Sequence, residues 1–122
     1  MQKICLYDIK IIMIQVFGLN KSFDTKTALR FFSERRIPVQ FVDLKEKEMS
    51  RGEFDSVLSV LSVEEMTDSK SKDYASIAYL DDEDKADKLF ENQAKLLKLP
   101  ICRNGKQSAT AGLSQKIWES WK

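Results

Sequence analysis

Ser22 is the residue whose position points most directly to chemistry, because it lies where an apolar strand gives way to an amphipathic helix. The strand pattern covers residues 13–18, and the helix pattern begins just after Ser22. A cysteine at such a helix start would be activated, because the free N–H groups and the positive end of the helix dipole lower a thiol pKa. A serine hydroxyl gains far less, since it stays protonated near neutral pH. As an N-cap, Ser22 would instead satisfy a free N–H group of the helix.

Other reactive side chains are few. The chain has two cysteines, Cys5 and Cys102, without CxxC spacing, and it has no histidine. These counts exclude the usual zinc-binding patterns and every Ser-His or Cys-His nucleophile pair, so we expect no metal site. Cys102 is either a thiol near the Ser22 loop or a small buried apolar residue. Sparse, unpaired cysteine is typical of a reducing cytoplasm, where we expect the protein to reside.

The bulk composition indicates one soluble globular domain. The 122 residues are 43% hydrophobic and 32% charged, and the formal net charge is +1. A chain of this size buries about two-thirds of the surface that its unfolded form exposes, so it needs neither disulfides nor a structural metal. The balanced charge argues against a dedicated nucleic-acid-binding protein, which would show a strongly basic face.

The first dozen residues form a mixed apolar and charged run. Asp8 and Lys10 interrupt its apolar stretch, so it is too charged for a membrane span, and no signal-peptide cleavage pattern follows. We therefore expect an N-terminal extension over residues 1–12 and one domain over residues 13–122.

The segment after Ser22 predicts the elements that position it. Apolar residues repeat at helical spacing from Thr25 to Phe32, and the helix is expected to end near Arg36, ahead of a proline. Residues 39–44 are β-branched and aromatic, which predicts a second strand. The opening unit is therefore β-α-β, with a parallel and right-handed crossover.

Residues 50–98 are predicted to form a helical insertion. Ser50 and Ser62 each begin a capping-box pattern ahead of apolar residues at helical spacing. Small helices follow, and from Asp82 a longer helix carries an apolar stripe that ends at Leu97. The alternating charges in this helix fit a solvated face.

The last third of the chain predicts a hairpin and a final helix. Strand-like runs over residues 99–111 flank the dipeptide Asn104-Gly105, which is a strong hairpin signal. Ser114 is placed to cap a helix that carries Trp118 and Trp121 as expected core residues. The whole order is β-α-β, helices, β-β-α, an α/β fold with a four-stranded mixed sheet flanked by helices.

Several short segments together have the order and spacing of a known family over essentially all of residues 13–122. They are Phe17-Gly18, Lys21 to Thr25, Ile37-Pro38, Phe41 to Asp43, Ser71 to Tyr74, Glu91 to Gln93, Leu97 to Ile101 and Arg103 to Gly105. The chain resembles the arsenate-reductase-like (ArsC) and Spx family of thioredoxin-fold proteins. The resemblance implies a thioredoxin-like fold and a cis peptide bond before Pro100, which shapes a peptide-binding edge.

The resemblance places Ser22 where the family holds its nucleophilic cysteine, and Thr25 where Spx-type proteins hold a second cysteine. Thiolate attack depends on the nucleophilicity and low pKa of sulfur, and a neutral hydroxyl offers neither that nucleophile nor a reducible product. We therefore expect the chain as written to be inactive. Ser22 then reflects a natural loss, an engineered cysteine-to-serine change or a recoded position.

Oxyanion binding departs from the family pattern as well. The resemblance implies an arginine before the cis-proline, because a guanidinium grips an oxyanion with a bidentate fork, and here that residue is Leu99. Lys21, Lys26 and Arg103 are candidate ligand-binding residues that compensate in part, or they are solvated surface charges. Thr25, Leu99 and Pro100 complete the set of candidate ligand-binding residues. The helix start at Ser22 is an anion site in principle.

Two functions from different classes follow from the resemblance. The first is a thiol-redox enzyme by descent, with no bound cofactor and with glutathione or glutaredoxin as its reducing partner if active. The second is a non-enzymatic module, since Spx-type relatives bind RNA polymerase and the edge at Pro100 recognises a protein partner without needing a thiol. In either case we expect a monomer without a membrane or direct nucleic-acid partner.

Overall fold

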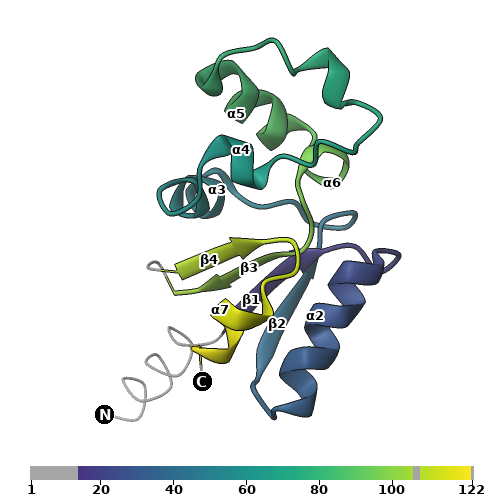
Figure 1. Ribbon diagram of the computed structural model, residues 1–122, viewed down its shortest axis with the longest axis vertical. Coiled ribbons are helices and arrows are strands. Elements are labelled where there is room, and N and C mark those ends of the chain that lie inside the picture. Colours follow the sequence, from purple (N-terminus) through teal and green to yellow (C-terminus); the bar gives the residue numbers. More distant parts are fainter. Residues whose placement is uncertain (1–13, 106–107, 122) are drawn as a thin grey trace.

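The computed structural model describes residues 14–105 and 108–121 of the chain (Figure 1). The expected extension over residues 1–12 and two residues of the predicted hairpin therefore lie outside the described residues. The elements follow the predicted order, and the strands form one four-stranded sheet of order β2-β1-β3-β4. The predicted α/β architecture with a mixed sheet is confirmed. In the described part of the chain, every helix is too short or too polar to cross a membrane.

The first half of the sheet is the β-α-β unit. Strands β1 (Ile14–Gly18) and β2 (Val39–Asp43) are parallel, and helix α2 (Phe23–Glu34) connects them. The helix ends before the predicted Arg36, because that residue adopts the left-handed conformation with φ of 57°. The Ile37 N–H then donates to the Phe32 carbonyl at 2.9 Å, which closes the last turn as a left-handed C-cap does.

The second half of the sheet is the predicted hairpin. Strands β3 (Ile101–Asn104) and β4 (Ser108–Ala111) pair antiparallel, and helix α7 (Gln115–Glu119) follows. The predicted side-chain cap at Ser114 was wrong, because the Ser114 hydroxyl makes no capping bond and only its carbonyl accepts from the helix. Trp118 is buried as predicted, and its indole N–H donates to the Thr110 hydroxyl at 2.8 Å.

Alternate residues of the central strand face two separate cores. Val16 and Cys102 lie on the face that α2 and α7 cover, where the ring centroids of Phe32 and Trp118 are 5.3 Å apart. Phe17, next along the strand, faces the core built with the helical insertion. Figure 1 shows the insertion helices gathered at the top of the view, with α2 and α7 below.

The helical insertion consists of short helices with local caps. They are α3 (Arg51–Leu58), α4 (Val63–Met66), the 3-10 helix η1 (Tyr74–Ser76), α5 (Asp82–Glu91) and α6 (Gln93–Leu96). Both predicted capping boxes are present, at Ser50 with Glu53 and at Ser62 with Glu65.

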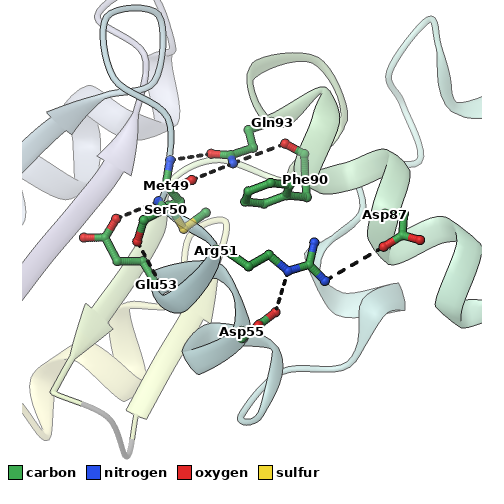
Figure 2. Close-up of polar contacts among 8 residues, drawn as sticks. All are labelled: Met49, Ser50, Arg51, Glu53, Asp55, Asp87, Phe90 and Gln93. Atoms are coloured by element: carbon green, nitrogen blue, oxygen red, sulfur yellow. Dashed lines mark hydrogen bonds and ion pairs between the residues drawn. The ribbon is translucent and has the colours of Figure 1, made fainter.

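The single long helix predicted from Asp82 to Leu97 is instead broken at Asn92. The Asn92 side chain donates back to the carbonyl of Lys88 at 3.1 Å, which satisfies the end of α5. The break brings the buried Gln93 amide against Met49, whose N–H it accepts at 2.7 Å and to whose carbonyl it donates at 3.1 Å (Figure 2). A continuous helix would leave these buried backbone groups unpaired, which is costly.

An exposed ionic contact also joins α3 to α5. The Arg51 guanidinium lies 3.4 Å from the Asp55 carboxylate and 3.9 Å from the Asp87 carboxylate, and it stacks 4.9 Å from the Phe90 ring centroid (Figure 2). Such exposed pairs contribute only about 0–1 kcal/mol, so the buried Gln93 bonds hold this region more firmly.

Candidate functional site

The Ser22 turn and the proline edge lie at the same end of the sheet. Strand β3 runs antiparallel to β1 and pairs Ile101 with Phe17, so the next step of the ladder places Pro100 beside Gly18. The Ser22 turn follows directly after Gly18 at the end of β1. The structure thus brings together the two segments that the sequence proposed as a site.

The proline edge itself is apolar. The Leu99–Pro100 peptide bond is cis, Pro100 is buried, and its carbonyl accepts a hydrogen bond from the Gly112 N–H at 3.0 Å. Leu99 is half-buried and packs against the core on the insertion side. An oxyanion at this edge would therefore meet an aliphatic side chain without a hydrogen-bond donor.

Ser22 is the N-cap of α2. Its hydroxyl oxygen accepts a hydrogen bond from the Thr25 N–H at 3.2 Å, and its own N–H donates to the Leu19 carbonyl at 3.0 Å. The Ser22 carbonyl accepts from the Lys26 N–H at 3.1 Å, as expected one turn into a helix. The cap role that the sequence predicts is confirmed, and it uses the hydroxyl oxygen for the fold.

Thr25 lies beneath the turn rather than on its surface. Its side chain is 0% exposed, and its hydroxyl oxygen accepts the Leu19 N–H at 3.4 Å. A Cβ at Gly18 would come within 2.7 Å of the Thr25 Cγ2, so the close approach of strand and helix requires glycine at that position. Thr25 therefore contributes packing and a backbone contact, and it offers no exposed surface to a ligand.

The charged residues at the Ser22 turn are of both signs. Lys21 and Lys26 are exposed, and neither has a carboxylate within 4.0 Å among the described residues. Asp24 lies in the first turn of α2, where its negative charge competes with any anion at the helix start. The Asn20 amide donates to the Asp43 carboxylate at 3.0 Å and ties the turn to the end of β2.

Arg103 lies away from this group. It pairs with Gln15, three residues along β1 from Gly18, which is about 10 Å at the rise of a strand. Its guanidinium donates to the Gln15 side chain at 2.9 Å and to the Ser56 hydroxyl at 3.2 Å. Of the three predicted cations, the structure brings Lys21 and Lys26 to the Ser22 turn and holds Arg103 elsewhere.

Cys102 is a buried apolar residue. It is 0% exposed on the face that α2 covers, and burial raises the pKa of its thiol to about 12, although a hydrogen bond with Thr110 lowers it in part. A thiol with this pKa is almost never ionised near neutral pH and is therefore a poor nucleophile. The same described residues hold no group of three or more Cys, Asp or Glu side chains that could bind a metal.

Phe23 is an exposed aromatic residue beside the Ser22 turn that the sequence pattern did not single out. It directly follows Ser22 and its side chain is 78% exposed, the second-highest value among the exposed large apolar residues. The helical periodicity could have indicated this exposure, because Phe23 lies outside the apolar stripe from Thr25 to Phe32 and a residue off the stripe faces away from the core.

Three leucines, the leucine row, also lie at this end of the sheet. Leu19 follows β1, Leu99 comes before the start of β3, and Leu113 follows β4, where the strands leave the sheet on the same side. The first two are half-buried and Leu113 is 47% exposed. Phe23 and this leucine row give the Ser22 end of the sheet an apolar rim with lysines around it.

Comparison with known proteins finds matches in structure. No protein-family profile matches the sequence, and no curated protein matches it. An ArsC family related protein from Bacteroides fragilis aligns with a TM-score of 0.78 at 15% identity, covering 92% of this chain and 99% of that one. Arsenate reductase from Vibrio cholerae aligns with a TM-score of 0.74 at 20% identity, covering 88% and 97%. An arsenate reductase related protein from Brucella melitensis aligns with a TM-score of 0.68 at 13% identity, covering 88% and 92%.

These alignments define the class of the fold. The chain has the thioredoxin-like fold of ArsC-related proteins, over nearly the whole length of each matched structure. Sequence identities of 13–20% show the fold and leave the chemistry to the residues of this chain.

Proposed function

We propose that this chain is an arsenate-reductase-like protein of thiol-redox descent in which Ser22 occupies the position of the redox cysteine, and that it performs no thiol-dependent reduction as written. The hydrogen bond between the Ser22 hydroxyl oxygen and the Thr25 N–H carries the proposal, because it shows the side chain serving as a helix cap. The structural likeness to arsenate reductases supports the descent.

The chemistry of the hydroxyl supports the same proposal. Reduction of an oxyanion or disulfide needs a sulfur that attacks, becomes oxidised and is reduced again, and a serine oxygen cannot pass through that cycle. An activated serine would also need a base within hydrogen-bonding reach. The only hydrogen-bond partner of the Ser22 hydroxyl in the described chain is a backbone N–H, and the full sequence has no histidine.

The test restores the thiol. We would measure arsenate and disulfide reduction with glutathione and glutaredoxin for the chain as written and for Ser22→Cys. For the alkylation measurement, Ser22→Cys would also carry Cys5→Ser and Cys102→Ala, so that the pH dependence of alkylation reports one thiol. We expect a pKa for the new thiol below the ordinary value of about 8.5, because it lies at the start of α2. Turnover by Ser22→Cys and not by the unaltered chain would support the redox descent. Turnover by the unaltered chain, which keeps Ser22, would overturn the proposal.

A second candidate function is a non-enzymatic protein-binding module, and the apolar rim favours it. Phe23 is 78% exposed beside the Ser22 turn, and the leucine row lies at the same end of the sheet, with Leu113 47% exposed. Exposed aromatic residues of this kind are enriched at protein interfaces. This candidate keeps the edge at Pro100 as a recognition surface and needs no thiol.

RNA polymerase of the source organism is the partner to test, as the Spx resemblance implies. The unaltered chain would be passed over immobilised, purified RNA polymerase beside Phe23→Ser and Tyr79→Ser. Tyr79 is 81% exposed in the helical insertion and serves as the matched control. Binding that Phe23→Ser weakens at least tenfold and Tyr79→Ser leaves unchanged supports the module. No binding, or equal losses, counts against it.

A further inference from the structure

Arg103 forms an unusual cationic group between the sheet and the helical insertion. It lies on β3, and its guanidinium reaches Gln15 on β1 and Ser56 on α3 at 2.9 and 3.2 Å. Gln15 lies 88 residues and Ser56 47 residues before Arg103 in sequence. The side chain is half-buried, and the two bonds hold the planar group in one orientation.

The guanidinium has no opposite charge beside it. Both hydrogen-bond partners are neutral, and the ion pairs within the described residues involve Arg51 and Lys88 only. The Nε atom of Arg103 is buried and finds no hydrogen-bond partner among residues 14–105 and 108–121. A partly buried cation without a counter-charge is costly, because it has lost water without gaining an anion.

The groups around Arg103 are suited to receive an anion. A guanidinium has five N–H groups, of which two are used here, so each terminal nitrogen keeps one hydrogen to donate. The Ser56 hydroxyl accepts from Arg103, and within the part of the chain that the structure describes it donates no bond, so its own hydrogen remains to be donated. The Gln15 amide nitrogen already donates to Gln40 at 3.1 Å, which fixes its oxygen toward Arg103.

We propose that Arg103 and Ser56 bind a small free oxyanion of the phosphate or sulfate type between β3 and α3. The fork of N–H groups on arginine matches the oxygen spacing of such anions, and its fixed orientation reduces the entropy that binding costs. The half-buried position favours a small anion over one carried on a large molecule. This site goes beyond the proposed function and is separate from the Ser22 turn, since Arg103 pairs with residue 15 of β1.

Anion binding at this place has a structural consequence. Because Ser56 belongs to α3 and Arg103 to the sheet, a bound anion would bridge the helical insertion to the β-rich part of the chain. A ligand that binds only the folded state raises the free energy of unfolding, and the gain grows with the logarithm of the ligand concentration once that concentration exceeds the dissociation constant. Inorganic phosphate should therefore stabilise the protein beyond the effect of ionic strength alone.

The experiment uses the full chain with sodium phosphate as the probe and sodium chloride of equal ionic strength as the reference. Titration calorimetry gives the dissociation constant, and the Arg103 Nε–H resonance in NMR reports the site directly. We expect phosphate to shift that resonance, and we expect Arg103→Met to weaken binding at least tenfold. Ser56→Ala should weaken binding less.

The control is Arg30→Met, which removes an exposed arginine from α2. Equal loss of binding in Arg30→Met and Arg103→Met would mean diffuse surface binding and would overturn the proposal. An unmoved Nε–H resonance in the unaltered chain would overturn it as well. This second readout also decides the case if Arg103→Met does not fold.

Discussion

The Ser22 hydroxyl oxygen and the Thr25 backbone N–H form a 3.2 Å hydrogen bond that closes the first turn of α2. The two residues occupy the positions where the family resemblance implies cysteines. In this chain their side chains serve the fold, since Ser22 caps the helix and buried Thr25 supports the preceding turn. Both hydroxyl groups therefore help to hold the start of α2 against the end of β1.

The cap predicts a measurable stability. Ser22→Ala leaves the Thr25 N–H without its partner and should lower the free energy of unfolding by about 1 kcal/mol, the usual value for an N-cap. Urea denaturation measures the change. Ser33→Ala is the matched control, because Ser33 is exposed within the same helix. Equal losses from both changes would contradict the cap assignment.

The contact between Gly18 and Thr25 predicts a coupling. Gly18→Ala should destabilise the protein by roughly 1–3 kcal/mol, because the new methyl group would meet the Thr25 Cγ2 at 2.7 Å. The loss should shrink in a Thr25→Ala background. Gly52→Ala is the control, since a Cβ there meets nothing within 4 Å, and it should be neutral or slightly stabilising. A Gly18→Ala cost that stays constant in both backgrounds would argue against direct contact.

The buried Gln93 amide predicts a large loss. Gln93→Leu would leave the Met49 N–H and carbonyl without partners, so we expect a cost above about 2 kcal/mol. Faster hydrogen exchange of the Met49 N–H would locate the effect. Gln40→Leu makes the same change at an exposed position and should cost much less. A Gln93→Leu variant as stable as Gln40→Leu would show that these bonds do not hold the insertion.

The Cys102 thiol predicts a dependence of stability on alkaline pH. Its pKa is about 12 in the folded protein against 9.0 for the free group, so the unfolded chain loses the proton first. The contribution of the protonated Cys102 thiol to the free energy of unfolding is therefore complete below pH 9, and it falls as the pH rises from 9 toward 12. Urea denaturation at pH 8 and pH 10 should show a smaller decline for Cys102→Ala than for the unaltered chain. Identical declines would mean that the thiol is not protected by burial.

Local sequence patterns predicted much of the fold. Contacts between residues far apart in sequence could not be predicted from them. The Ser22 cap and the capping boxes at Ser50 and Ser62 involve partners three residues away, so spacing alone indicates them. The Gln93 and Met49 pair is separated by 44 residues, and nothing local signals that it breaks the long helix.

The location of the candidate site was predictable from the sequence, but the set of cations around it was not. Ser22, Leu99 and Pro100 meet at one end of the sheet, because the order of the strands, together with the family resemblance, already implied that edge. Arg103 is close to Pro100 in sequence, yet strand direction carries it away from the Ser22 turn toward Gln15. Sequence proximity was therefore a poor guide to which cation faces the turn.

The absence of thiol chemistry at Ser22 is tested most directly by one reaction rate. The measurement is the initial rate of arsenate reduction by the unaltered chain with glutathione, glutaredoxin and an NADPH-coupled regenerating system. We predict a rate equal to that of the same mixture without the protein. A rate above that background, which Ser22→Ala then abolishes, would contradict the account, because the serine itself would be carrying the reaction.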